Sequence, residues 1–200
     1  MGMNDLLEWV KEHPGMTWVL SLYAVFFVVL YSLPEMGEVL LVSPDEPLAR
    51  PWTFLTVMFS NAMVLHLVLN GFLIVMIGAR LEKAASLMTA LGVFLVTGLL
   101  GSLSILVYAP LLSSTGDPVA LSSAAALGMA GAYAAMKPEE TILKSKAHRW
   151  VIILFIMNIL LSFQHEVVTM MGPANAVGLI TGWLIGYGLK KRLAQEPEPA

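Results

Sequence analysis

The chain has 200 residues, of which 58% are hydrophobic and only 12% are charged, and it contains no cysteine. A soluble domain carries roughly 25% charged residues, so this composition, with a mean hydropathy of +0.78, predicts a polytopic membrane protein. A net charge of −3 without a basic patch argues against nucleic acid as a partner, and the lack of cysteine excludes disulfides and thiolate chemistry.

A polar segment, residues 1–16, opens the chain and carries a short amphipathic run that suits a helix at the membrane interface. Six apolar segments follow, each about long enough to cross a bilayer as a helix. They lie at residues 17–33, 61–77, 85–108, 119–136, 150–163 and 174–189. We therefore expect an all-α fold with one six-transmembrane-helix domain over residues 17–189, and a tail over residues 190–200.

The Lys and Arg residues are unevenly distributed among the connecting segments. If the amino terminus is cytoplasmic, cytoplasmic segments hold ten of the eleven Lys and Arg residues, and the outer segments hold only Arg50. Because positive charge is retained on the cytoplasmic side, this asymmetry predicts a multi-pass protein of the cell membrane with both termini in the cytoplasm.

Two polar residues, His66 and Asn70, lie inside the second apolar segment. A spacing of four residues places them on one face of a helix. Exposing either side chain to lipid costs roughly 1–3 kcal/mol, so both should face the bundle interior. Intramembrane polar residues of this kind indicate a functional site. The alternative is that they form hydrogen bonds between helices and only stabilise the bundle.

Small residues dominate the fourth and sixth segments, which predicts close packing of these helices. On the residues alone, Ser122 and Ser123 at the start of the fourth segment are expected to bond a carbonyl one turn back more often than to act as nucleophiles. Asn175 lies one turn before the glycines of the sixth segment. The glycines expected to pack are Gly128 and Gly131 in the fourth segment, and Gly178, Gly182 and Gly186 in the sixth.

The order and spacing of these features resemble the rhomboid family of intramembrane serine proteases, over about residues 50–189. The resemblance implies a bundle of six helices, a nucleophile at Ser123, and an oxyanion hole that includes His66 and Asn70. Donors aimed at a developing oxyanion contribute a few kcal/mol each. The matching motifs are His66-x-x-x-Asn70, Gly78-x-x-Leu81-Glu82, Ser123 followed by Gly128 and Gly131, and the glycine stripe of the last helix.

The chain departs from the family at the catalytic machinery. Leu121 and Ala124 replace both glycines of the Gly-x-Ser-Gly motif, Leu127 replaces an aromatic residue, and Asn175 replaces the catalytic His. Asn cannot take the proton of a serine hydroxyl, which is a poor nucleophile without a base. Losing one member of such a unit costs about 10⁴–10⁶ in rate.

We therefore expect a pseudoprotease that binds transmembrane segments of other membrane proteins in the lipid bilayer, with Ser123 as a vestigial nucleophile. No cofactor or metal is expected. The first alternative is an active endopeptidase in which another residue replaces the base, His165 being the first candidate. The second is a small-solute transporter, which is disfavoured because the apolar segments lack acidic residues and internal repeats.

Overall fold

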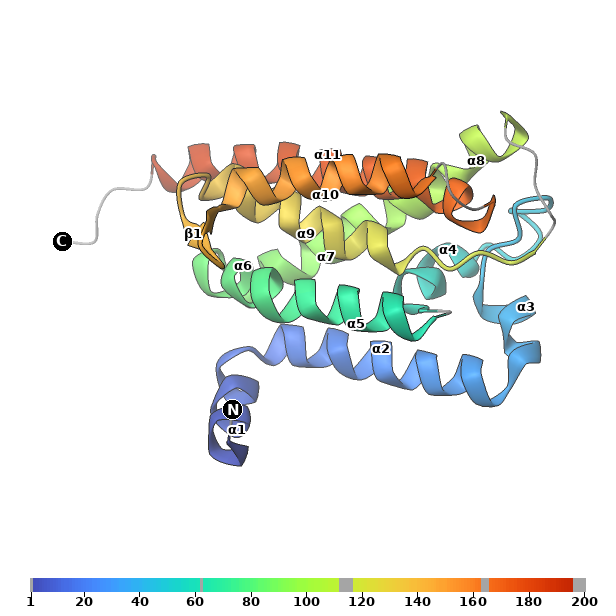
Figure 1. Ribbon diagram of the computed structural model, residues 1–200, viewed down its shortest axis with the longest axis horizontal. Coiled ribbons are helices and arrows are strands. Elements are labelled where there is room, and N and C mark those ends of the chain that lie inside the picture. Colours follow the sequence, from blue (N-terminus) through green and yellow to red (C-terminus); the bar gives the residue numbers. More distant parts are fainter. Residues whose placement is uncertain (1, 62, 112–116, 163–165, 196–200) are drawn as a thin grey trace.

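The computed structural model describes residues 2–61, 63–111, 117–162 and 166–195. Its long helices run side by side in one bundle, except for the amino-terminal helix, which lies outside the bundle at a steep angle to it (Figure 1). The longer helices are α1 (Met3–Glu12), α2 (Pro14–Ser32), α5 (Val64–Leu73), α7 (Leu87–Leu103), α9 (Ser122–Met136), α10 (Ala147–Ser162) and α11 (Glu166–Leu193). The short elements are η1 (Pro34–Met36), α3 (Gly37–Leu40), α4 (Thr53–Thr56), η2 (Val57–Phe59), η3 (Ile74–Gly78), α6 (Ala79–Ala84), α8 (Ile105–Tyr108), η4 (Ala109–Leu111), β1 (Thr141–Ile142) and β2 (Ser145–Lys146).

The structure confirms the all-α class of membrane protein predicted from composition. Within the described residues, three helical stretches are long and apolar enough to cross a membrane, at Pro14–Ser32, Val64–Ala84 and Leu87–Leu111. The second of these runs from α5 through the π-turn η3 into α6, and the third joins α7 to α8 and η4. Helices α9, α10 and α11 lie over the other three predicted segments.

Most helix boundaries differ from the prediction by a few residues, and the second helical stretch extends to Ala84 rather than to residue 77. Two further differences lie next to the polar end of the fourth and last helices. The fourth helix begins at Ser122 rather than at residue 119, because Val119 pairs with Val42 in an isolated β-bridge, through N–H···O bonds of 2.9 and 3.4 Å. The last helix begins at Glu166 and continues through Pro173, which we had expected to precede it. A backbone pairing with a distant residue is not visible in local hydrophobicity, so the sequence overestimated the length of the fourth helix.

Helix α9 forms the centre of the bundle, where every one of its residues is buried. It packs against α5, α7, α10 and α11, and Figure 1 shows it between these helices. The α9–α11 contact is a backbone contact at three glycines of α11. A Cβ atom added to Gly178, Gly182 or Gly186 would overlap a carbonyl oxygen of α9. Glycine at these positions therefore lets the two helices approach closely enough to bury α9 completely.

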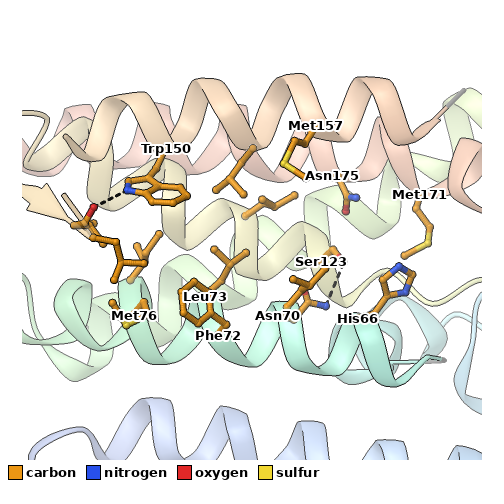
Figure 2. A pocket seen from close by; sticks show the side chains of 16 residues that line it. His66, Asn70, Phe72, Leu73, Met76, Ser123, Trp150, Met157, Met171 and Asn175 are labelled. Carbon is orange, nitrogen blue, oxygen red and sulfur yellow. Dashed lines mark hydrogen bonds between the residues drawn. The ribbon is translucent and has the colours of Figure 1, made fainter. Parts of the chain in front are cut away.

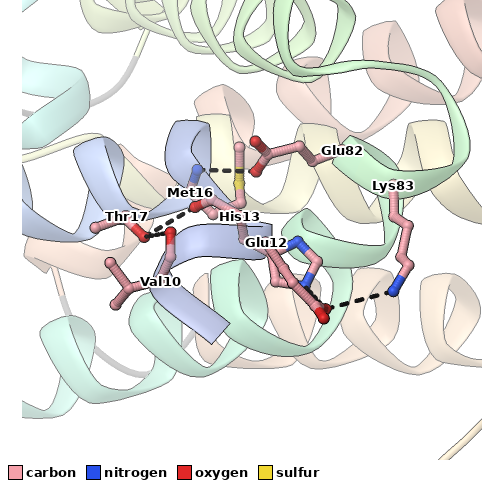
Figure 3. A network of polar contacts seen from close by, with 7 residues as sticks. All are labelled: Val10, Glu12, His13, Met16, Thr17, Glu82 and Lys83. Atoms are coloured by element: carbon pink, nitrogen blue, oxygen red, sulfur yellow. Dashed lines mark hydrogen bonds and ion pairs between the residues drawn. The ribbon is translucent and has the colours of Figure 1, made fainter. Parts of the chain in front are cut away.

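The amino-terminal helices are joined to the bundle through a buried carboxylate. Glu82 of α6 accepts hydrogen bonds from the backbone N–H groups of Gly15 (2.9 Å) and Met16 (3.0 Å), at the first turn of α2. These N–H groups have no partner within their own helix, and Glu82 supplies an acceptor for each. Figure 3 shows the bond to Met16. Beside it, Lys83 forms an exposed ion pair with Glu12 of α1, 3.4 Å apart.

A β-hairpin joins α9 to α10, an addition to the all-helical prediction. Its strands β1 and β2 pair Thr141 with Lys146 and Ile142 with Ser145. The two turn residues, Leu143 and Lys144, have φ values of 47° and 66°. Turns of this kind favour Asn-Gly, so the Leu-Lys sequence gave no turn signal.

Candidate functional site

A network of four polar side chains lies at the amino-terminal end of α9. Asn70 Nδ2 donates to Asn61 Oδ1 at 2.9 Å and to the hydroxyl oxygens of Ser122 and Ser123 at 3.1 Å each. Ser122 Oγ in turn donates to Asn61 Oδ1 at 2.9 Å. All four residues are buried. The hydrogen bonds compensate for the cost of removing these groups from water, and they connect α5, α9 and the segment before α5.

Local structure explains how the network is assembled. Ser122 and Ser123 are the first two residues of α9, and Asn70 lies two turns into α5 on its buried face. Tyr23 of α2 donates to the backbone carbonyl of Ser122 at 3.2 Å, which fixes the start of α9 against α2. The two N–H groups of the Asn70 amide face three acceptors, so this one side chain holds the network together.

An apolar groove of about 300 Å³ extends from this network between α5 and α10 (Figure 2). We call it the groove. Its polar residues Ser123, Asn70, His66 and Asn175 gather at one end (Figure 2), and the rest of its wall is hydrophobic apart from the indole of Trp150. The lining residues are His66, Leu69, Asn70, Phe72, Leu73, Met76, Ile77, Ser123, Leu127, Ile142, Leu143, Trp150, Leu154, Met157, Met171 and Asn175.

The structure brings the four predicted site residues to one end of the groove. Asn70 bonds Ser123 directly, while His66 and Asn175 line the groove beside them. Asn175 is buried on α11, and His66 is half-buried on α5. Leu127, one turn after Ser123, lines the same cavity.

Two members of the network, Asn61 and Ser122, were not predicted as site residues. Asn61 lies in the break between η2 and α5, so no helical spacing relates it to Asn70. Ser122 differs from Ser123 by one position, and a hydrophobicity pattern cannot decide which hydroxyl faces a partner helix. The only sequence signal was the presence of an amide and a second hydroxyl inside apolar segments.

Within the part of the chain that the structure describes, no titratable side chain of α11 lines the groove beside Ser123. Among the described groove-lining residues, His66 is the one with a titratable side chain, and it lies on α5 with Asn70 rather than on α11. Asn175 presents an amide, which cannot accept the Ser123 proton. His165, considered above as a substitute base, lies outside the described residues. Among the described residues, no three His, Asp or Glu side chains cluster to hold a metal ion.

Comparisons with known proteins agree with the motifs. A family model described as the Rhomboid domain matches residues 48–192. The chain is 30% identical over 137 residues to RHOMBOID-like protein 6, mitochondrial, of Arabidopsis thaliana, and the match covers 68% of this chain. It covers 43% of that protein, so the chain spans less than half the length of this relative. No solved structure matches the chain.

Proposed function

Because this chain belongs to the rhomboid family of membrane proteins, we propose that it is a pseudoprotease that binds single transmembrane helices without cleaving them. One observation carries the proposal: Asn175 lines the groove together with Ser123, and the sequence resemblance assigns to Asn175 the position of the family's catalytic His. The network keeps the serine and a donor, Asn70, but supplies no base.

The chemistry supports a loss of about 10⁴–10⁶ in the rate of cleavage, as expected when one member of the catalytic unit is missing. A serine hydroxyl attacks a peptide carbonyl only when another group removes its proton. The amide of Asn175 has no titratable nitrogen, and Leu127 offers no aromatic face against which an imidazole could stack. Ser123 in this setting acts as a buried hydrogen-bond acceptor for Asn70.

The groove supports binding of a helix from the bilayer. Three of its lining residues are about half exposed, with exposed fractions of 50% at Leu69, 47% at Phe72 and 51% at Met157. In a membrane protein this surface meets lipid or another helix. A helix that enters between α5 and α10 would meet polar partners at Asn70 and Ser123, which favours clients with a polar or helix-breaking residue.

The experiment is a comparison of wild type with Ser123→Ala on a labelled transmembrane substrate in liposomes. We expect no cleavage by either protein, and no reaction of Ser123 with a fluorophosphonate. Crosslinking of the same substrate should occur with both proteins. Cleavage by wild type but not by Ser123→Ala would overturn the proposal and favour the alternative, an active endopeptidase. The small-solute transporter would be indicated instead by solute flux through liposomes containing the protein.

A gain-of-function test separates a missing base from other defects. Asn175→His alone should give little or no activity, because Leu121 and Ala124 still replace glycines that permit close backbone approach around the serine. The combination of Asn175→His, Leu121→Gly, Ala124→Gly and Leu127→Tyr is expected to give the highest activity. Equal inactivity of the single and combined variants would mean that residues other than these four prevent catalysis.

The proposed setting is a cell membrane, with several spans and both termini in the cytoplasm. The Lys and Arg asymmetry supports this orientation. Because the chain has no cysteine, single cysteines introduced at Lys144 and Glu46 can be labelled selectively from either side. We expect only Glu46→Cys to react with an impermeant reagent from outside. Labelling of Lys144→Cys instead would invert the topology.

A further inference from the structure

Helix α1 leaves the bundle and points away from the other helices (Figure 1). None of its residues is buried. At helical spacing, Met3, Leu6 and Leu7 share one face, and their exposed fractions are 74%, 47% and 52%. The opposite face carries the acidic residues of this helix, Asp5, Glu8 and Glu12. The folded chain therefore presents an apolar helix face that no described part of the protein covers.

The orientation of α1 is fixed where it meets α2. The ring centroids of Trp9 and His13 lie 5.1 Å apart, and Trp9 also packs against the buried core. The Thr17 hydroxyl of α2 donates to the backbone carbonyl of His13 at 2.8 Å (Figure 3). On the other side, Lys83 of α6 meets the Glu12 carboxylate at 3.4 Å. These contacts join α1 to the folded protein, so its apolar face keeps one direction relative to α2.

The position of α2 determines what lies next to this face. Helix α2 is apolar and long enough to cross a membrane, and His13 alone separates it from α1. Near its start, Trp18 is 68% exposed, and Trp side chains of membrane proteins are enriched at the level of the headgroups. Trp18 lies about 6 Å along α2 from Pro14, and the headgroup layer of one leaflet is about 5–7 Å thick. Helix α1 therefore extends sideways from α2 within or just below this layer.

The charges of α1 select the kind of membrane surface that it fits. The helix holds three acidic residues and one basic residue, Lys11. Among the described residues, the ion pairs of α1 involve only Glu12. Helices that depend on anionic lipids carry Lys and Arg on their polar face, whereas the polar face of α1 repels an anionic surface. Burial of its apolar side chains must supply the attraction, and neutral headgroups are compatible with its acidic face.

We propose that α1 lies in the plane of the leaflet in which α2 begins, with Met3, Leu6 and Leu7 inserted among neutral phospholipids and the acidic face in water. Because α1 is fixed to the start of α2, its insertion sets the depth at which α2 enters the membrane. The inference goes beyond the proposed function and holds whether or not Ser123 is reactive.

The test is electron paramagnetic resonance of the whole protein in liposomes of dioleoylphosphatidylcholine. Because the chain has no cysteine, a nitroxide can be attached to one introduced cysteine at a time. In Met3→Cys and Leu6→Cys we expect the label to collide more with oxygen, which concentrates in the bilayer, than with a water-soluble nickel chelate. Glu8→Cys is the matched control on the opposite face and should show the reverse preference. A preference for nickel at all three positions would overturn the proposal.

Further arms test the cause of insertion and its partner. With the label on Leu6→Cys, a second change Leu7→Glu should shift the preference toward nickel, whereas Asn4→Glu, the same added charge on the polar face, should not. An equal response to the two changes would contradict insertion of the apolar face.

Lipid charge and self-association separate the remaining occupants. The pattern should be no stronger in liposomes of equimolar dioleoylphosphatidylcholine and dioleoylphosphatidylglycerol, and its appearance only in that mixture would refute the choice of neutral lipid. Dipolar broadening of the Leu6→Cys spectrum that disappears on dilution with unlabelled protein would identify a second copy of the chain on this face, which would also refute it.

Discussion

Replacement of Gly182 by alanine should destabilise the bundle, although alanine is the better helix former. Gly182 lies where α11 crosses α9, and an added Cβ would lie 2.6 Å from the carbonyl carbon of Gly128 and 2.8 Å from its Cα atom. Both neighbours are backbone atoms of a buried helix, so no side chain can rotate away. The helices must move apart, and α9 loses its close contacts with α11.

The size of the effect follows from two opposing contributions. Overpacking of a closely packed contact costs about 1–3 kcal/mol. Replacing glycine by alanine inside a helix returns about 0.5–1 kcal/mol. We therefore expect Gly182→Ala to lower the free energy of unfolding by about 1–2 kcal/mol, and Gly182→Leu to lower it further, because its side chain is larger.

Gly188 provides a matched control on the same helix. No atom lies within 4 Å of a Cβ added there, so Gly188→Ala should raise the free energy of unfolding by about 0.5–1 kcal/mol through helix propensity alone. The assay is SDS titration in detergent micelles followed by circular dichroism. Equal midpoints for Gly182→Ala and Gly188→Ala would refute the reasoning, because the argument requires shifts of opposite sign.

Three further predictions concern other polar contacts. Glu82→Ala leaves two N–H groups of α2 without their acceptor and should cost about 2–5 kcal/mol, while Glu82→Gln, which keeps one acceptor oxygen, should cost about half as much by the same titration. Asn70→Ala should cost about 1–2 kcal/mol, whereas an unchanged midpoint would show that the network adds no stability. At the surface, a hydrogen bond from Lys146 lowers the pKa of Glu139, so this contact stabilises the fold above the ordinary carboxyl pKa and is lost as the pH falls through the lowered value. Lys146→Ala should return the Glu139 pKa toward its ordinary value in an NMR titration.

Much of the fold was determined by local composition. Apolar segments of suitable length identify the helices because the cost of leaving unpaired backbone groups in lipid permits few other structures. The small residues of the fourth and sixth segments predicted close packing, and the structure places Gly178, Gly182 and Gly186 directly against the backbone of α9. The sequence also singled out Asn70 and Ser123, because polar side chains inside apolar segments are costly and therefore informative.

Only the tertiary structure decided which of these polar groups meet. Asn70 bonds Ser122 and Ser123 across 52 and 53 positions of sequence, and Ser122 bonds Asn61 across 61. Periodicity relates residues within one helix, but the register between helices depends on how whole surfaces pack. For the same reason the sequence did not show the groove between α5 and α10, the bridge that shortens α9, or the Leu143–Lys144 turn. Each arises because distant segments impose a conformation that the local residues do not favour on their own.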